Sequence, residues 1–279
     1  MIDHQRKLQK RGIHDQAMSA GWQRSQAYKT QGWQYPIFDL DGSVIATRYK
    51  AANKDAKMKY AWVGGKPDHP LADWYILPNT QDAISRAGGV CYLANGEPAL
   101  LAYHTAGIHN AIATTVSETT VPRNLLDVLQ SLGVTRLLYP VDNDNAGRQS
   151  GIKFRDALQA TGIDFEAFSW GDDAPAKADA NDMWMQDRFD TATFQHRLAH
   201  LVPLALPMPE PKRGYTSQPD TPDTTPHSLI EALISRLNVR GWRANGWSKN
   251  VSSPFHEDKK PSFGIRRDNG VGKDFATGE

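Results

Sequence analysis

The chain has a single cysteine, no long apolar run and almost no net charge, and each absence excludes a class of protein. With only Cys91 among 279 residues, neither an internal disulfide nor a zinc site built from several cysteines can form, which fits a reducing compartment. Cys91 lies within an apolar run, so we expect it to be a small core residue. The net charge of +1 argues against a protein that wraps nucleic acid through its total charge, but it allows local basic patches.

Signals for membranes and for nucleotide-driven motors are also missing. No stretch approaches the ~18 apolar residues that a membrane span needs. The N-terminus, MIDHQRKLQKRGIHDQ, is charged and lacks the apolar centre of a signal peptide. No Gly-x-x-x-x-Gly-Lys-Ser/Thr loop occurs, which excludes a P-loop helicase motor within the chain. With 39% hydrophobic residues, we expect a soluble, cytoplasmic protein with a packed core and no membrane partner.

Composition divides the chain into four expected parts. Seven prolines fall within residues 201–227 among serine, threonine and aspartate, a composition typical of a semi-extended linker outside any core. Before it we expect a basic α+β subdomain at 1–85 and an α/β catalytic domain at 86–200. After it we expect a short amphipathic helix at 228–239 and a small β-rich tail, together spanning 228–279.

Within residues 86–200, strand-length and helix-length apolar patterns alternate. The strands are expected at 90–94, 110–114, 135–141 and 163–169, and the helices at about 98–106, 122–132, 146–160 and beyond 180. Pro122 suits a first helical turn, and Gly133 a helix end. Strands separated by helices predict a parallel sheet covered on both faces.

Acidic residues follow two of these strands. Glu97 comes after the first, and Asp142 and Asp144 come after the third. Ligands collect at the carboxyl ends of parallel strands, and gathered carboxylates suit Mg²⁺. Each acid could instead cap the helix that follows it. That alternative applies most strongly to Asp179 and Asp182, which an acidic helix start explains as well as a second metal site does.

Basic and aromatic residues interleave near the N-terminus. The β-rich runs 35–40 and 43–50 are separated by Asp41-Gly42, a strong hairpin signal. Basic residues on and after the second run are Arg48, Lys50, Lys54, Lys57 and Lys59, with Tyr49, Tyr60 and Trp62 between or beside them. These side chains could neutralise phosphates and stack on bases, or form a solvated hairpin whose aromatics face the core. Arg148 could bind phosphate from a first helical turn or be an ordinary surface arginine.

The stretch from Gly89 to Asp182 resembles the Toprim domain, which bacterial-type primases, topoisomerases and some nucleases share. The resemblance is carried by Gly96-Glu97-Pro98, by Asp142-Asn143-Asp144-Asn145-Ala146-Gly147-Arg148, and by Asp179-Ala180-Asn181-Asp182. Many relatives have Glu-Gly where this chain has Glu97-Pro98. The preceding segment PIFDLDGSVIATRYK is similar, more loosely, to the basic subdomain that precedes Toprim in phage and plasmid primases.

The tail SSPFHEDKKPSFGI resembles the zinc-binding domain of DnaG-like primases. His256 stands at a ligand position, but Ser253, Asp274 and Thr277 occupy the positions of the cysteines. One histidine cannot hold structural zinc, so we expect a degenerate domain without zinc.

The resemblance implies a DNA primase, a nucleotidyltransferase that makes short RNA primers on single-stranded DNA during replication. Its partners would be the DNA template, ribonucleoside triphosphates and a separate replicative helicase, and its cofactor Mg²⁺ or Mn²⁺. Glu97 would act in proton transfer or metal binding, Asp142 and Asp144 would bind the metal, and Asp179 and Asp182 would form a second site. Two alternatives stay open: a Toprim nuclease that uses the same carboxylates, and a non-catalytic nucleic-acid-binding accessory.

Overall fold

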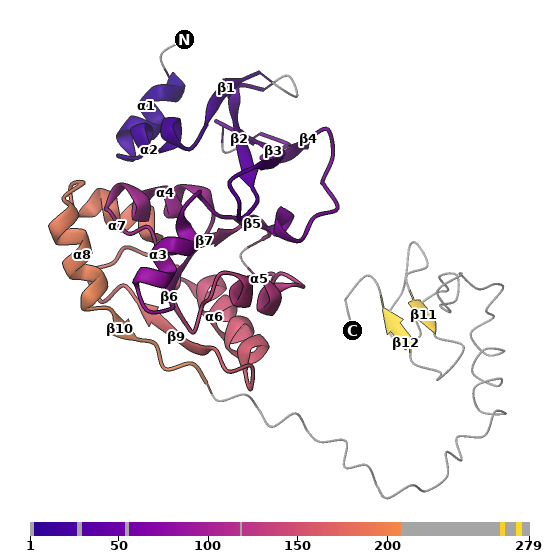
Figure 1. Cartoon of the computed structure of the whole chain (residues 1–279), viewed down its shortest axis with the longest axis vertical. Helices are drawn as coiled ribbons and strands as arrows, with labels where there is room; N and C mark the ends of the chain where they lie inside the picture. Colours follow the sequence, from indigo (N-terminus) through magenta and orange to yellow (C-terminus); the bar gives the residue numbers. More distant parts are fainter. Residues whose placement is uncertain are drawn as a thin grey trace, which may run out of the picture. The chain divides into compact units, whose positions relative to one another are not determined.

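The computed structural model describes residues 3–26, 30–53, 56–117 and 119–207, and two short strands near the C-terminus (Figure 1). The chain divides into two compact units, Met1–Pro209 and Glu210–Glu279. In the second unit, β11 (Phe263–Ile265) pairs antiparallel with β12 (Gly272–Asp274). The helix expected at 228–239 and the positions of Ser253, His256 and Thr277 lie outside the described residues.

The first unit begins with two short helices and an antiparallel sheet. The helices are α1 (Asp3–Lys10) and α2 (His14–Ser19), and the four strands, in spatial order, are β1 (Gln23–Ser25), β2 (Gly32–Phe38), β3 (Val44–Ala51) and β4 (Tyr60–Val63). The expected hairpin is confirmed, because β2 and β3 pair antiparallel in a register that sets Tyr35 opposite Arg48. Trp33, Tyr35 and Ile37 alternate along β2 and are all buried, so one face of this sheet points into a core.

A six-stranded sheet follows, in the order β10-β9-β8-β6-β7-β5. Its strands are β5 (Trp74–Tyr75), β6 (Val90–Ala94), β7 (Ala111–Thr114), β8 (Arg136–Pro140), β9 (Asp164–Ser169) and β10 (Val202–Pro203). The helical segments are η2 (Pro70–Asp73), α3 (Thr80–Arg86), α4 (Glu97–Thr105), α5 (Leu125–Ser131), α6 (Asn145–Leu158), α7 (Ala180–Gln186) and α8 (Thr191–Ala199). The four central strands run parallel, and β5 and β10 close the edges antiparallel.

Alternating side chains of the central strands pack into two separate hydrophobic cores, one on each face of the sheet, as a sheet covered on both faces requires. Cys91 and Leu93 of β6 pack with buried residues of α3, α5 and α6, which confirms Cys91 as a core residue. Ala94 of β6 and Ala113 of β7 belong to the other core, with α4, α7 and α8. That second core continues into α2 and β2, so it joins the two sheets and fixes how the N-terminal strands approach the start of α4.

Three expectations about elements were wrong in detail. Helix α5 begins at Leu125 and not near Pro122, whose carbonyl accepts a turn hydrogen bond from the Leu125 amide at 3.2 Å. The sequence pattern missed β5 and α3. The expected linker starts too early, because β10 pairs with β9 and the Leu204 amide donates to the carbonyl of Ala167 at 2.9 Å. Among the described residues, no helix has the length and apolarity to cross a membrane.

The buried histidine of α4 makes stability depend on pH. Burial, and then the neighbouring His109, lower the pKa of His104 to about 4. The unfolded chain takes up that proton near pH 6.5, so stability is lost as the pH falls from about 6.5 towards 4. We expect the wild type to lose about 2 kcal/mol more than His104→Gln between pH 7.5 and pH 5, measured by urea unfolding. Equal losses in the two proteins would contradict a neutral His104.

Candidate active site

Glu97 is the first residue of α4, immediately after β6 reaches the carboxyl edge of the sheet. Gly96 precedes it with φ +78° and ψ 175°, a conformation that suits glycine and turns the chain from strand to helix. Pro98 follows within the first helical turn, where its missing N–H leaves no helical hydrogen bond unmade. The Glu97 side chain is only 2% exposed, so a charge on it needs partners.

Three side chains of the N-terminal sheet supply those partners. The Tyr35 hydroxyl donates to Oε1 of Glu97 at 2.5 Å, and Arg48 Nη1 donates to the same oxygen at 3.0 Å. Lys50 Nζ lies 3.5 Å from Oε2. Because Tyr35 is on β2 and both cations are on β3, the carboxylate links the N-terminal sheet to the first turn of α4.

Arg48 and Lys50, two of the basic residues expected to interleave with aromatic ones, also contact aromatic rings. The Arg48 guanidinium carbon lies 5.0 Å from the centre of the Trp62 ring and 5.2 Å from that of Tyr60. Lys50 Nζ lies 4.7 Å from the centre of the Tyr60 ring. These cation–π contacts with rings of β4 help to hold both cations beside Glu97.

The surroundings of Glu97 decide its protonation. Burial opposes the charged form, but Lys50, Arg48 and the Tyr35 hydroxyl together outweigh burial and lower the pKa of Glu97. Burial and the nearby Glu97 charge hold the pKa of Tyr35 well above its usual value, so its hydroxyl stays a donor. At neutral pH Glu97 is therefore ionised, which leaves it no proton to give as a general acid and makes it a weak base.

The acidic loop, defined as residues 142–144, follows β8 at the same edge of the sheet. Asp142 Oδ1 accepts a hydrogen bond of 2.7 Å from Asn95 Nδ2. Asp144 caps α6, because its Oδ1 accepts from the Gly147 amide at 2.9 Å. A Cβ at residue 147 would lie 2.3 Å from the Asp142 carbonyl oxygen, so only glycine permits this close approach. Gly147 of the motif thus allows the close packing that fixes the loop.

Glu97 and Asp142 line one cavity of about 420 Å³, together with Arg48, Asn95 and residues at the end of β7. The structure therefore brings together a carboxylate from each of two strand ends, with one of the predicted cations beside them. An adjoining cavity of about 350 Å³ shares Tyr60, Asn95 and Gly96 with the first. Its further lining is basic and aromatic and includes Lys7, Arg11, Lys50, Lys59, Trp22 and Trp33.

Asp179 and Asp182 form a capping box at the start of α7. The Asp182 amide donates to Asp179 Oδ1 at 2.9 Å, and the Asp179 amide donates to Asp182 Oδ2 at 3.3 Å. Burial, and then the charge of Asp182, raise the pKa of Asp179. These contacts are those of an acidic helix start. Asp179 also lines the basic cavity. The backbone amide of Asn143 donates to the Ala178 carbonyl at 3.0 Å, so the segment before α7 lies against the acidic loop.

The remaining predicted cations lie further out. Lys57 and Lys59 are exposed on the segment that enters β4, and Lys59 reaches the basic cavity. Arg148 is exposed in the first turn of α6, where its amide donates to the Asp144 carbonyl at 3.2 Å. Lys54 lies outside the described residues.

The donor set fits a divalent ion that brings other ligands with it. Within residues 3–26, 30–53, 56–117 and 119–207, no three His, Cys, Asp or Glu side chains gather closely enough to hold an ion. Mg²⁺ is usually held by only one or two carboxylates, with phosphates and water completing its shell. Asp142 lines the strand-end cavity and could supply one such carboxylate, whereas Asp144, two residues further on, caps α6 and is not among the residues that line that cavity.

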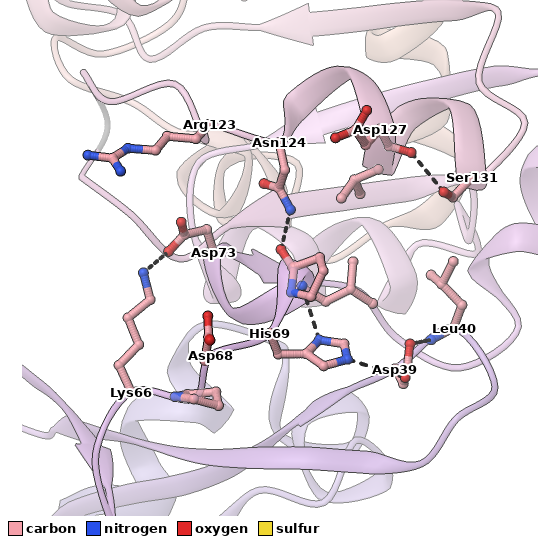
Figure 2. Close-up of a pocket in the computed structure, with 14 residues that line it drawn as sticks. Asp39, Leu40, Lys66, Asp68, His69, Asp73, Arg123, Asn124, Asp127 and Ser131 are labelled. Carbon is pink, nitrogen blue, oxygen red and sulfur yellow. Dashed lines mark hydrogen bonds and ion pairs between the residues drawn. The ribbon is translucent and has the colours of Figure 1, made fainter.

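A larger cavity lies elsewhere in the first unit, and none of the predicted site residues line it. It measures about 850 Å³ and is lined by the loops before β5 and the start of α5 (Figure 2). Lys66 pairs with Asp73 at 2.6 Å, and His69 lies 3.5 Å from Asp39, so much of its charge is balanced locally. Its volume alone therefore does not make it a reaction site.

No protein-family model and no curated protein sequence matches this chain, but solved structures do. A DnaG catalytic core has a TM-score of 0.54 at 15% identity, with 85% of this chain and 78% of that chain covered. The Escherichia coli primase catalytic core gives 0.53 at 16% identity, covering 71% and 73%. The RNA polymerase domain of Mycobacterium tuberculosis primase DnaG, in complex with double-stranded DNA, gives 0.50 at 19%, covering 83% and 68%. The chain therefore has the α/β fold of primase catalytic cores.

Removing the charge of Glu97 should destabilise the protein strongly, because Arg48 would remain buried without its counter-ion. We expect Glu97→Gln to lower the free energy of unfolding by about 3 kcal/mol at pH 7. The folded pKa is the lower one, so this difference should persist down to about pH 4 and shrink only below it. Urea unfolding at several pH values measures it.

A double-mutant cycle gives the control. Arg48→Met combined with Glu97→Gln should cost about 2 kcal/mol less than the sum of the single changes. Additive losses would show that the two side chains do not interact in solution.

Proposed function

We infer that the chain is a primase-type nucleotidyltransferase, which joins ribonucleotides into short primers on a single-stranded DNA template. One observation carries this proposal. Asp142 and the Glu97-bound Arg48 line one cavity at the strand ends, and a basic, aromatic cavity adjoins it, on a fold shared with primase catalytic cores. Nucleotidyl transfer needs carboxylates, phosphate-binding cations and stacking surfaces side by side.

Each group has a task that suits its place. Asp142 and Asp144 would hold Mg²⁺ or Mn²⁺, which when bound neutralises the triphosphate and activates the attacking 3′-hydroxyl. Glu97 holds Arg48, which lines the same cavity, and Lys50, which lines the adjoining basic cavity, and both would bind phosphate oxygens there. Glu97 itself would keep these two cations in place, since an ionised carboxylate with a lowered pKa transfers protons poorly.

The basic cavity suits the nucleic-acid strand. Lys7, Arg11 and Lys59 would neutralise backbone phosphates, and Trp33 and Tyr60 offer rings on which bases can stack. Double-stranded DNA is present in the similar Mycobacterium tuberculosis structure, which is compatible with a nucleic-acid surface on this fold.

Asp142→Asn should abolish primer synthesis while leaving the fold intact, because the amide keeps the shape of the side chain but removes a metal-binding charge. We expect a loss of at least ~100-fold in ribonucleotide incorporation on single-stranded DNA, measured with labelled nucleotides. Asp82→Asn, an exposed residue of α3, is the matched control and should keep full activity.

The same assay separates the alternatives. Cleavage of the template without synthesis by the wild type would favour a nuclease. Binding of DNA without either reaction, together with full biological function of Asp142→Asn, would favour a non-catalytic accessory.

Lys59→Ala should weaken binding of single-stranded DNA about equally for all sequences, because the contact would be to phosphate. Loss of one phosphate contact should reduce the slope of log K against log salt concentration by about 0.7. Fluorescence anisotropy between ~50 and ~200 mM salt measures this slope. Lys153→Ala, whose Nζ bonds the Thr119 carbonyl at 2.7 Å on an exposed surface, is the control and should leave the slope unchanged. An unchanged slope in Lys59→Ala would contradict the proposed strand path.

A further inference from the structure

A chain of hydrogen bonds runs from the interior of the first unit to the acidic loop. Ser150 Oγ on α6 lies 3.0 Å from the Tyr139 hydroxyl on β8. That hydroxyl lies 2.5 Å from Asn95 Oδ1, and Asn95 Nδ2 lies 2.7 Å from Asp142 Oδ1. Tyr139 is fully buried and Ser150 is 1% exposed, so the inner part of the chain is shielded from water.

The chemistry of these groups sets the direction of the chain. An amide donates only through nitrogen, so the Asn95 Nδ2 must face the Asp142 carboxylate and its Oδ1 must face Tyr139. Tyr139 has one proton and uses it on Asn95, which leaves Ser150 to donate to the Tyr139 oxygen. Every proton therefore points towards Asp142, and donors aligned in this way strengthen one another.

We propose that Asn95 is a positioning residue for Asp142. The side chain of Asn95 is a neutral amide, so it also keeps the acidic site too weakly charged to bind a divalent ion firmly before a nucleotide arrives. Asn95 lines both cavities. It is the residue that contacts Asp142 where the two cavities adjoin, and it carries no charge. Its hydrogen bond also uses part of the capacity of Asp142 Oδ1 to bind a further partner. The ion then depends on phosphate oxygens as further ligands. The proposal rests on the proposed function in naming a nucleotide as the source of these oxygens and in measuring the positioning role by primer synthesis.

Glu97 does not supply the missing charge. Its two oxygens face Tyr35, Arg48 and Lys50, and two cations already offset its charge. A carboxylate at position 95 would instead stand directly against Asp142 and add a second negative charge there. The sequence places Asn95 two residues before Glu97, on the other side of the Gly96 turn, which is why the two side chains serve different partners.

The test is binding of Mn²⁺ alone to the full chain, by isothermal titration calorimetry without nucleotide. We expect Asn95→Asp to bind Mn²⁺ at least ~10-fold more tightly than the wild type, because a carboxylate beside Asp142 adds an oxygen ligand and a negative charge. Asn145→Asp is the matched control, since it adds the same charge at an exposed position beside the loop. It should change the affinity less than ~3-fold. Asn95→Glu repeats the test with a longer side chain should Asn95→Asp fail to fold.

A folded Asn95→Asp or Asn95→Glu that binds Mn²⁺ no more tightly than Asn145→Asp would overturn the proposal. So would a wild type that binds Mn²⁺ alone as tightly as these variants do. A separate variant, Tyr139→Phe, tests the positioning role of Asn95, because it removes the hydroxyl donor that orients the Asn95 amide. In that variant, the Mg²⁺ concentration needed for half-maximal primer synthesis should rise at least ~3-fold, and an unchanged midpoint would contradict it.

The outcome is distinguishable from failure of the proposed function. A wild type that makes no primer but shows the expected order of Mn²⁺ affinities would remove the primase proposal and leave the role of Asn95 in ion binding standing.

Discussion

The buried charge of Glu97 is the interaction on which the site depends. It begins α4 of the six-stranded sheet, but all its partners in the site come from β2 and β3 of the N-terminal sheet. A carboxylate that is 2% exposed is stable only while those partners stay in place, and Arg48, almost as buried, equally needs the carboxylate. These contacts therefore fix the position of the N-terminal sheet relative to the six-stranded sheet. That position puts the cations of β3 beside the strand ends.

Close backbone packing fixes the acidic wall of the site. Gly147 lets the first turn of α6 come against the Asp142 carbonyl, and Asp144 caps the same turn. The hydrogen-bond chain through Tyr139 and Asn95 then sets the Asp142 carboxylate. Neither wall relies on long flexible side chains alone, so the spacing between cations and carboxylates follows from the fold.

Much of this arrangement could be predicted from the sequence, for definite reasons. The strands and helices between residues 90 and 199 have regular apolar periods, and the carboxyl ends of parallel strands necessarily share an edge. Helix α5 was placed too early, because Pro122 fits a turn as well as it fits a helix start. The partners Tyr35 and Asn95 could not be found, since one depends on how two sheets pack and the other looks like a turn residue. The motif containing Asp179 and Asp182 has a capping-box spacing, and local backbone contacts account for it.

The charges on the two walls suggest why a nucleotide and its ion would enter together. Arg48 and Lys50 share one buried carboxylate, which leaves a net positive charge on this group, while Asp142 brings negative charge to the cavity that Arg48 also lines. A free divalent ion would gain from the aspartates but be repelled by the cations, and a free triphosphate would meet the reverse. The complex of the two would satisfy both walls at once, because its phosphates would reach the cations while its metal would reach the aspartates. A neutral residue at position 95 preserves this balance, whereas a third carboxylate would favour the ion alone.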